Sequence, residues 1–173
     1  MKTMSKVSLV LSCVLLASVG LVQRASAGTA AYPTTDHPSF LVDLPDDWKV
    51  DQAEEAGGYV DITGPTGATI SFRTIEGSID DLKAAVSEAD GYLKEHFDDV
   101  KLAPAEKSEQ RGLGGFRRLG TGKDKDGGAE TAFLLAWYDL KDGKIGEIWY
   151  AVEMGDEKGH AAAVKILDSF RAP

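Results

Sequence analysis

The chain has 173 residues, of which 28 are acidic and 19 are lysine or arginine, so its formal net charge at pH 7 is −9. An acidic surface repels nucleic-acid phosphates and anionic lipid headgroups, which argues against a nucleic-acid-binding or membrane-surface protein. The single cysteine, Cys13, excludes a fold that is held by disulfides within the chain.

The start of the chain has the pattern of an export signal. Lys2 and Lys6 form a short basic beginning, residues 7–22 are mostly apolar, and residues 25–27 (Ala-Ser-Ala) match a signal-peptidase cleavage site. The apolar run is too short and too often interrupted for a membrane-spanning helix. We therefore expect residues 1–27 to be a cleaved signal peptide, and the protein to be periplasmic or extracellular without stable membrane insertion.

Cys13 allows a second interpretation of this segment. Residues 10–13 (Val-Leu-Ser-Cys) are similar to a lipoprotein cleavage box, which would leave a lipid anchor on Cys13. The apolar stretch before Cys13 is very short, however, and seven largely apolar residues follow it. We therefore favour the cleaved signal and keep lipid anchoring as the minor alternative.

The part of the chain after the signal is expected to contain one domain. Residues 28–38 are small, polar and proline-containing, which predicts a flexible N-terminal tether. Residues 39–173 should form a single domain, which is long enough to bury a hydrophobic core. Its first strand is predicted over residues 40–44, where apolar side chains alternate onto one face until Pro45 ends the run.

Alternating apolar residues and glycine-rich turns predict the remaining strands. Residues 132–138 are wholly apolar or aromatic, so their strand is expected in the middle of a sheet that is covered on both faces. Asp142-Gly143 predicts a two-residue hairpin turn, which would pair Trp137 near position 148. The predicted strands are 48–51, 59–63, 68–75, 100–111 (interrupted by Pro104), 116–122, 129–140 and 145–154, with a loop at 52–58 and turns at 64–67, 112–115 and 123–128.

Two helices are predicted between and after these strands. Ser78 and the acids that follow it form a helix start, and apolar residues then recur at three- and four-residue steps from Ile79 to Phe97. Asp156 can cap a second helix that reaches Phe170. Hairpins with two inserted helices predict an α+β fold on a mainly antiparallel sheet.

Three segments resemble the Mog1/PsbP-like domains, which include the DcrB-related exported bacterial proteins. These segments are residues 40–48 (FLVDLPDDW), residues 112–117 (GLGGFR) and residues 166–171 (ILDSFR). The resemblance implies an antiparallel sheet flanked by helices on both faces, in agreement with the doubly covered strand at 132–138. It also implies a protein that acts by binding other proteins rather than by catalysis. It assigns no binding residue, because the matching segments are structural.

The histidines and the most acidic turn do not form a predicted metal site. His37, His96 and His160 lie far apart in the sequence, without a His-Glu-x-x-His pair or a cysteine beside them. Residues 124–127 (Asp-Lys-Asp-Gly) are similar to the start of a calcium loop, but Leu135 stands where the twelfth-position glutamate is required. A hairpin turn explains these residues better.

The search for catalytic groups is equally negative. No serine lies in a Gly-x-Ser-x-Gly motif, and residues 112–115 lack the lysine and the strand-to-helix setting of a phosphate loop. The paired carboxylates fall in turns or at helix ends, and no acid is evident within an apolar pattern. We therefore expect no catalytic, cofactor-binding or metal-binding residue, no cofactor and no enzymatic activity.

The aromatic residues and the uneven charge leave a binding function as the main hypothesis. Trp137 and Trp149 are expected in the core, whereas the short strand that carries Trp48 could leave its indole in a surface groove. Acids gather over residues 43–61 and basic residues over 111–125, which could guide a protein partner. The expected function is an exported non-enzymatic domain that binds a protein partner in the cell envelope. The alternatives are a carrier of a small apolar or lipid ligand between sheet and helix and, last, a hydrolase or metal enzyme.

Overall fold

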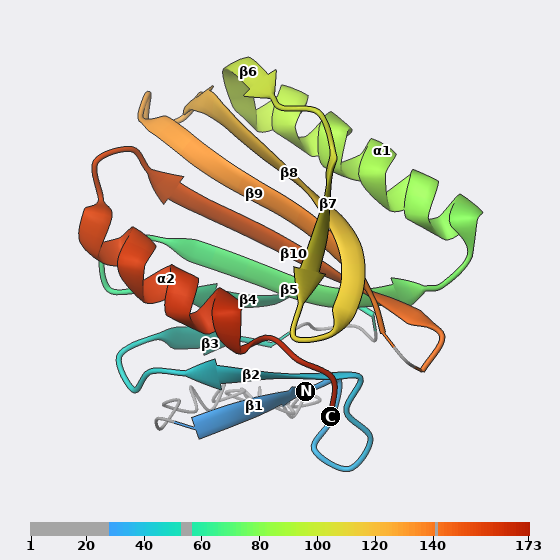
Figure 1. Cartoon of the computed structure of the whole chain (residues 1–173). Coiled ribbons are helices and arrows are strands. Elements are labelled where there is room, and N and C mark those ends of the chain that lie inside the picture. The colour runs from blue at the N-terminus through green and yellow to red at the C-terminus, as the bar shows by residue number, and fades with distance from the viewer. Residues whose placement is uncertain (1–27, 53–56, 141) are drawn as a thin grey trace, which may run out of the picture.

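A computed structural model describes residues 28–52, 57–140 and 142–173 (Figure 1). The expected signal peptide and much of the expected loop at 52–58 lie outside these residues. No helix within the described ranges combines the length and apolar character that a membrane span requires. The elements are β1 Gly28–Tyr32, β2 Phe40–Leu44, β3 Lys49–Asp51, β4 Val60–Thr63, β5 Thr69–Glu76, α1 Ile79–His96, β6 Phe97–Leu102, β7 Glu106–Gln110, β8 Leu113–Asp124, β9 Glu130–Asp139, β10 Lys144–Glu153 and α2 Glu157–Ser169.

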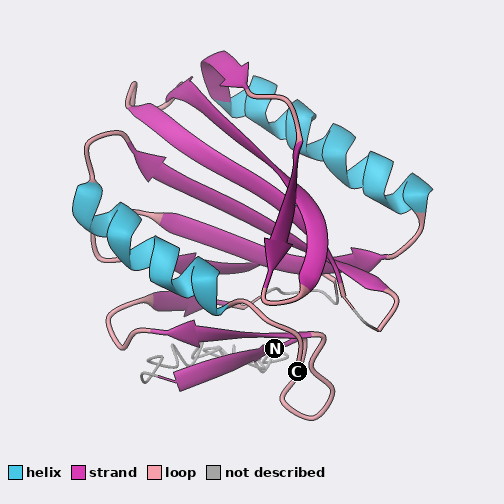
Figure 2. Cartoon of the chain, viewed as in Figure 1, coloured by secondary structure: helices cyan, strands magenta, loops and turns pink. Residues whose placement is uncertain are grey.

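The main sheet is antiparallel, in the order β3-β4-β5-β10-β9-β8-β6, and β7 pairs with another part of β8. Helix α1 packs against one face of this sheet, and α2 together with the separate β1–β2 hairpin packs against the other (Figure 2). The chain is therefore an α+β protein with helices on both faces of its sheet, as the sequence predicts.

Strand β9 shows how the sequence produces two cores. Successive side chains of a strand point to opposite faces, so an unbroken apolar run supplies both. Leu135 and Trp137 belong to the cluster under α1, whereas Ala136 and Tyr138 belong to the cluster under α2. Strand β9 pairs with β8 and β10 on its two sides, which confirms the predicted central position of residues 132–138.

The start of the described chain is an ordered strand and not a tether. Strand β1 pairs with β2 from Gly28 opposite Leu44 to Tyr32 opposite Phe40. The Tyr32 ring is 8% exposed and stacks on the Phe40 ring at 5.0 Å. The prediction of a flexible segment over residues 28–38 is therefore wrong for residues 28–32. Small and polar residues give no strand signal alone, but here β2 supplies the pairing partner.

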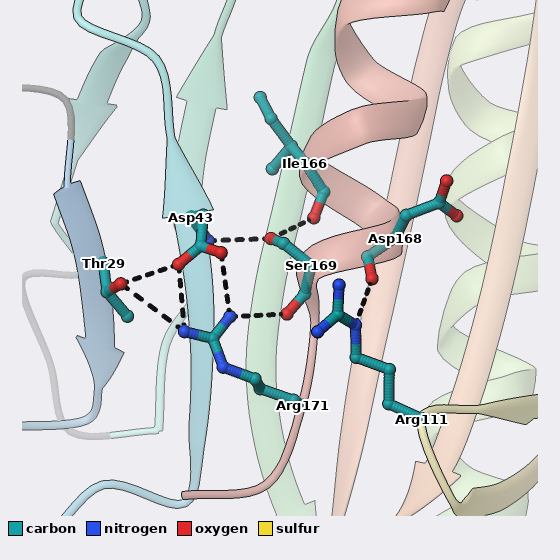
Figure 3. Close-up of polar contacts among 7 residues, drawn as sticks. All are labelled: Thr29, Asp43, Arg111, Ile166, Asp168, Ser169 and Arg171. Carbon is teal, nitrogen blue, oxygen red and sulfur yellow. Dashed lines mark hydrogen bonds and ion pairs between the residues drawn. The ribbon is translucent and has the colours of Figure 1, made fainter.

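A cluster of polar contacts joins the β1–β2 hairpin to the end of α2 (Figure 3). The guanidinium of Arg171 donates to both carboxylate oxygens of Asp43, at 3.0 and 3.1 Å, and Thr29 donates to the same carboxylate at 2.6 Å. The Ser169 hydroxyl accepts from the backbone N–H of Asp43 at 2.7 Å. These bonds hold the first strands of the described chain against its last helix.

The β9–β10 hairpin has a different register from the predicted one. Gly143 adopts a left-handed φ of 83°, its N–H donates to the Leu140 carbonyl, and the Leu140 N–H donates to the Lys144 carbonyl. Three residues therefore lie between the paired positions 140 and 144, not two. The shift by one position places Glu147 opposite Trp137, where the two-residue turn would have placed position 148.

Other predictions hold or fail for simple packing reasons. Ser78 caps α1 as predicted, but Ile79 is 71% exposed because it lies in the first turn, beyond the edge of the sheet. The predicted turn at 112–115 is shorter, since β8 already begins at Leu113, which is fully buried. Trp48 is 3% exposed and packs in the core under α2, so it lines no surface groove. The strand predicted over residues 145–154 ends one residue earlier, and Met154, which follows β10, is 56% exposed.

Replacing Tyr32 by alanine should lower the free energy of unfolding by about 3 kcal/mol, because the change removes a buried ring and leaves a cavity. The matched control is Thr35→Ala, at an exposed position three residues later, which should change that free energy by less than about 0.5 kcal/mol. Urea denaturation of the two variants measures both values. Equal stability of the two variants would contradict the packing of β1.

The contact between Asp43 and Arg171 should make stability depend on pH. The hydrogen bonds from Arg171 and then Thr29 hold the pKa of Asp43 below its ordinary value. The stabilisation is therefore complete above the ordinary aspartate pKa of about 4 and is lost as the pH falls through the lowered value. The side chain of Asp43 is half exposed, so we expect Asp43→Asn to cost less than about 1 kcal/mol at pH 7. Urea denaturation of both proteins at pH 7 and at a series of lower pH values should show this difference shrinking as the pH falls through the lowered pKa of Asp43.

Candidate functional site

One row of the sheet beneath α1 contains a buried charged group. Glu147 on β10 is 0% exposed and is the only charged residue among the fully buried residues that the structure describes. It lies opposite Arg73 of β5 on one side and opposite Trp137 of β9 on the other. Tyr59, just before β4, lies next to this row. Four segments that are distant in sequence therefore meet at one carboxylate.

Every oxygen of the Glu147 carboxylate has a donor. The Trp137 indole N–H donates to Oε1 at 2.9 Å, and the Tyr59 hydroxyl donates to Oε2 at 3.0 Å. The Nε of Arg73 also donates to Oε2, and another guanidinium nitrogen binds the exposed carboxylate of Glu88 on α1 at 2.9 Å. The guanidinium carbon of Arg73 lies 4.4 Å from the centre of the Tyr59 ring. A buried carboxylate requires such partners, and here they are all present.

The network raises the pKa values of Tyr59, its neutral donor, and of Arg73, its cation. Burial, followed by the charge of Glu147, raises the pKa of Tyr59 well above its ordinary value. Burial alone would lower the pKa of Arg73, but its bonds to Glu88 and Glu147 outweigh that effect and raise it further. Tyr59 therefore stays a neutral donor and Arg73 a cation over the whole physiological pH range.

The expectation that no acid lies within an apolar pattern is wrong at Glu147. Its strand reads Ile145-Gly-Glu-Ile-Trp-Tyr, so the glutamate is flanked by residues that become buried. That pattern is the sequence signal that could have identified it. The number of residues in the turn between β9 and β10 decides which residue lies opposite Trp137. The two-residue turn assumed for the hairpin would have placed Ile148 there.

Next to this network, the same face of the sheet is hollowed. The hollow, which we call the α1 groove, has a volume of about 550 Å³ and lies between the second half of α1 and strands β3, β4, β5 and β10. Its floor carries Thr63, Thr69 and Ser71, and Trp149 lies beside Ser71 on β10. Tyr59, Tyr92, Asp51, Asp61 and Glu88 also line it. Its inner part is apolar and is lined by Leu93, Phe97, Phe133, Leu135 and Ala151.

The groove is open because α1 covers only part of the sheet. On β4 and β5 the apolar residues Ile62, Ile70 and Phe72 point to the α2 side. The alternate positions from Asp61 to Thr63 and from Thr69 to Arg73, which face the α1 side, are polar and need no apolar cover. Helix α1 buries Ala89 and Leu93 over β9 and β10 instead. The alternation of apolar and polar residues along β4 and β5 thus leaves a polar part of the sheet uncovered beside α1.

The histidines and the acidic turn lie where no metal would be held. His37 is exposed in a loop, His96 stacks its ring 4.2 Å from the Tyr92 ring, and His160 hydrogen-bonds the Tyr150 hydroxyl at 2.8 Å. Burial raises the pKa of Tyr150 to about 12. Among the described residues, no group of three histidine, cysteine or acidic side chains converges as metal ligands would. The Asp124 carboxylate accepts two backbone N–H groups of its own turn at 2.7 Å, which accounts for that motif.

A smaller hollow lies on the opposite face, between α2 and strands β8 to β10. Its volume is about 270 Å³, and Leu134, Ile148 and Leu167 line it together with His160. Leu119, at its margin, is 48% exposed. This hollow is apolar but lies against the surface of the protein.

Glu147→Gln should lower the free energy of unfolding by about 3 kcal/mol, since it leaves the Arg73 charge without its buried counterion. The control is Glu88→Gln, which removes the exposed partner of the same arginine and should cost less than about 1 kcal/mol. Urea denaturation at pH 7 measures both. If the two variants lost equal stability, burial would not distinguish the two ion pairs.

Comparison with known proteins identifies the fold. No protein-family model matches the chain, and no curated protein matches it in sequence. Among solved structures, cyanobacterial PsbP from Synechocystis matches with a TM-score of 0.61 and 15% identity, over 91% of this chain and 99% of its own. LpqN of Mycobacterium tuberculosis matches with a TM-score of 0.55 and 18% identity, over 84% and 90%.

The yeast protein Mog1p from Saccharomyces cerevisiae matches with a TM-score of 0.52 and 14% identity, over 85% of this chain and 96% of its own. A longer protein from Bacteroides thetaiotaomicron is matched over only 47% of its length. At these identities the likeness concerns the fold alone. The chain has the Mog1/PsbP-like fold.

Proposed function

We propose that this protein is an exported, non-enzymatic binding domain that holds a segment of a partner protein in the α1 groove. The observation that carries the proposal is the groove itself, a hollow of about 550 Å³ between α1 and the sheet, lined by hydroxyl, carboxylate, aromatic and apolar side chains. Mog1p, a Ran-binding protein, supports binding of a protein on this fold, and LpqN, which is involved in cell envelope biogenesis, supports a role in the cell envelope. A binding function therefore has precedents on this fold.

The pattern of residues 1–27 supports export as part of the proposal. A basic start, an apolar run and an Ala-Ser-Ala site form a cleavable signal. Cleavage after Ala27 would leave a chain that begins at Gly28, the first residue of β1, with 16 basic residues against 28 acidic ones. The cell envelope or the extracellular medium is then the place of action.

The chemistry of the groove favours binding over catalysis. Its carboxylates at Asp51 and Glu88 are exposed, and no histidine or cysteine is among its lining residues. The carboxylate of Glu147 is fully buried, accepts three hydrogen bonds and does not line the groove, so it is not presented there as a base. The hollow under α2, the other candidate, is smaller than the roughly 300 Å³ that small-ligand pockets usually have.

A substitution on the groove floor should separate the partner from the protein. Ser71→Trp would fill the groove with an indole, and we expect it to abolish capture of the partner from the cell-envelope fraction. The matched control is Ser87→Trp, at an exposed position of α1 that lines a different surface. Affinity capture followed by mass spectrometry compares the two variants with the unchanged protein.

Capture that is equally strong for all three proteins would overturn the groove as the binding site. The mass of the protein recovered from the envelope tests export separately, with a chain starting at Gly28 as the expected result. A protein found only in the cytoplasm with residues 1–27 intact would contradict that part of the proposal.

A further inference from the structure

Two of the three carboxylates that line the α1 groove have no ion-pair partner among the described residues. Asp51, Asp61 and Glu88 line the groove, whereas no lysine or arginine is among the lining residues that the structure describes. Glu88 is bound to Arg73. Asp51 and Asp61 make no ion pair within the described ranges, although Lys49 stands two residues from Asp51 on the same face of β3.

The positions of Asp51 and Asp61 make this arrangement unfavourable for the empty protein. The two residues are direct register partners across β3 and β4, so their side chains stand next to each other on one face. Like charges directly opposite each other in an antiparallel pair repel and destabilise the sheet. A cation placed between them would remove that repulsion.

Aromatic rings line the same groove, and Trp149 lies in one register row with these carboxylates, separated from Asp61 by Ser71 of β5. The Tyr59 ring stands at 77° to the Trp149 ring with centres 6.1 Å apart, and the Tyr92 ring at 86° with centres 5.3 Å apart. Two rings therefore stand nearly perpendicular to a third. Tyr92 is 48% exposed, and one face of Tyr59 already carries the guanidinium of Arg73. The groove thus shows in its own structure how such a ring accepts a planar cation.

We infer that the α1 groove binds an arginine side chain of the partner protein, with its guanidinium at the Asp51 and Asp61 carboxylates, in the groove that the Trp149 and Tyr92 rings also line. The inference rests on the proposed function. Arginine fits both halves of the site, because its planar guanidinium can bind carboxylates with several N–H groups and stack on an aromatic face. A lysine ammonium satisfies the carboxylates but stacks less well. The net charge of −9 would also steer a basic segment toward this protein.

Three short peptides test the chemistry directly. They share the sequence acetyl-Gly-Ser-X-Ser-Gly-amide, where X is arginine, lysine or citrulline, the uncharged analogue of arginine. Titration of the ¹⁵N-labelled protein, followed through the indole N–H signal of Trp149, should show saturable binding of the arginine peptide. We expect weaker binding of the lysine peptide and none of the citrulline peptide.

Matched variants locate the site. Asp51→Asn combined with Asp61→Asn should weaken binding of the arginine peptide by at least about tenfold, because the guanidinium loses both of its carboxylate partners. Glu76→Gln combined with Glu109→Gln changes the net charge equally at exposed positions outside the groove and should leave binding unchanged. Equal weakening by both pairs would mean that only the overall charge matters, and it would overturn the inference.

The outcomes also separate this inference from the proposed function. If the arginine peptide fails to bind while capture of the partner still depends on Ser71, the groove binds its partner by other chemistry and the inference is wrong. If lysine and arginine peptides bind equally, the site recognises charge and not the guanidinium, which also overturns it. If the arginine peptide binds in the groove but no partner is lost in Ser71→Trp, the proposed function fails instead.

Discussion

The buried carboxylate of Glu147 is the group whose placement needs the most support, because burial of a charge without partners would cost several kcal/mol. It remains inside because three neighbours from three other segments donate hydrogen bonds to it. Each neighbour is thereby fixed. Arg73 is held so that it also reaches Glu88 on α1, and Tyr59 is held beneath the guanidinium. The carboxylate therefore ties the helix to the sheet and closes one end of the α1 groove.

The shape of the groove follows from how little of the sheet α1 covers. An antiparallel sheet with one apolar and one polar face can leave the polar face in water. Strands β4 and β5 do this, while β9 and β10 need cover on both sides and receive α1 on one of them. The boundary between the two halves of the face is the groove. Its mixture of hydroxyl, carboxylate and aromatic groups is the chemistry that meets at such a boundary.

The strands and helices could be predicted from the sequence because each follows a clear period. The bounds of β2, the Ser78 cap of α1 and the central place of β9 all agree with the pattern. The groove could not be predicted, since it depends on which strands α1 covers. The pairing of Glu147 with Trp137 could not be predicted, because one residue in the turn before β10 decides whether position 147 or position 148 lies opposite Trp137. Strand β1 could not be predicted, because its extended structure comes from pairing with β2 and not from a pattern in its own residues.

The tie between Asp43 and Arg171 joins residues 128 positions apart in the chain (Figure 3). The sheet has a similar property, since β5 has β4 on one side but finds its second neighbour only in β10. A ribosome releases these segments in chain order, so β2 and β5 emerge long before Arg171 and β10 have been synthesised. Their apolar faces are uncovered during that interval, a condition that makes nascent chains depend on chaperones. The molecule thus closes late, after its final helix has been made.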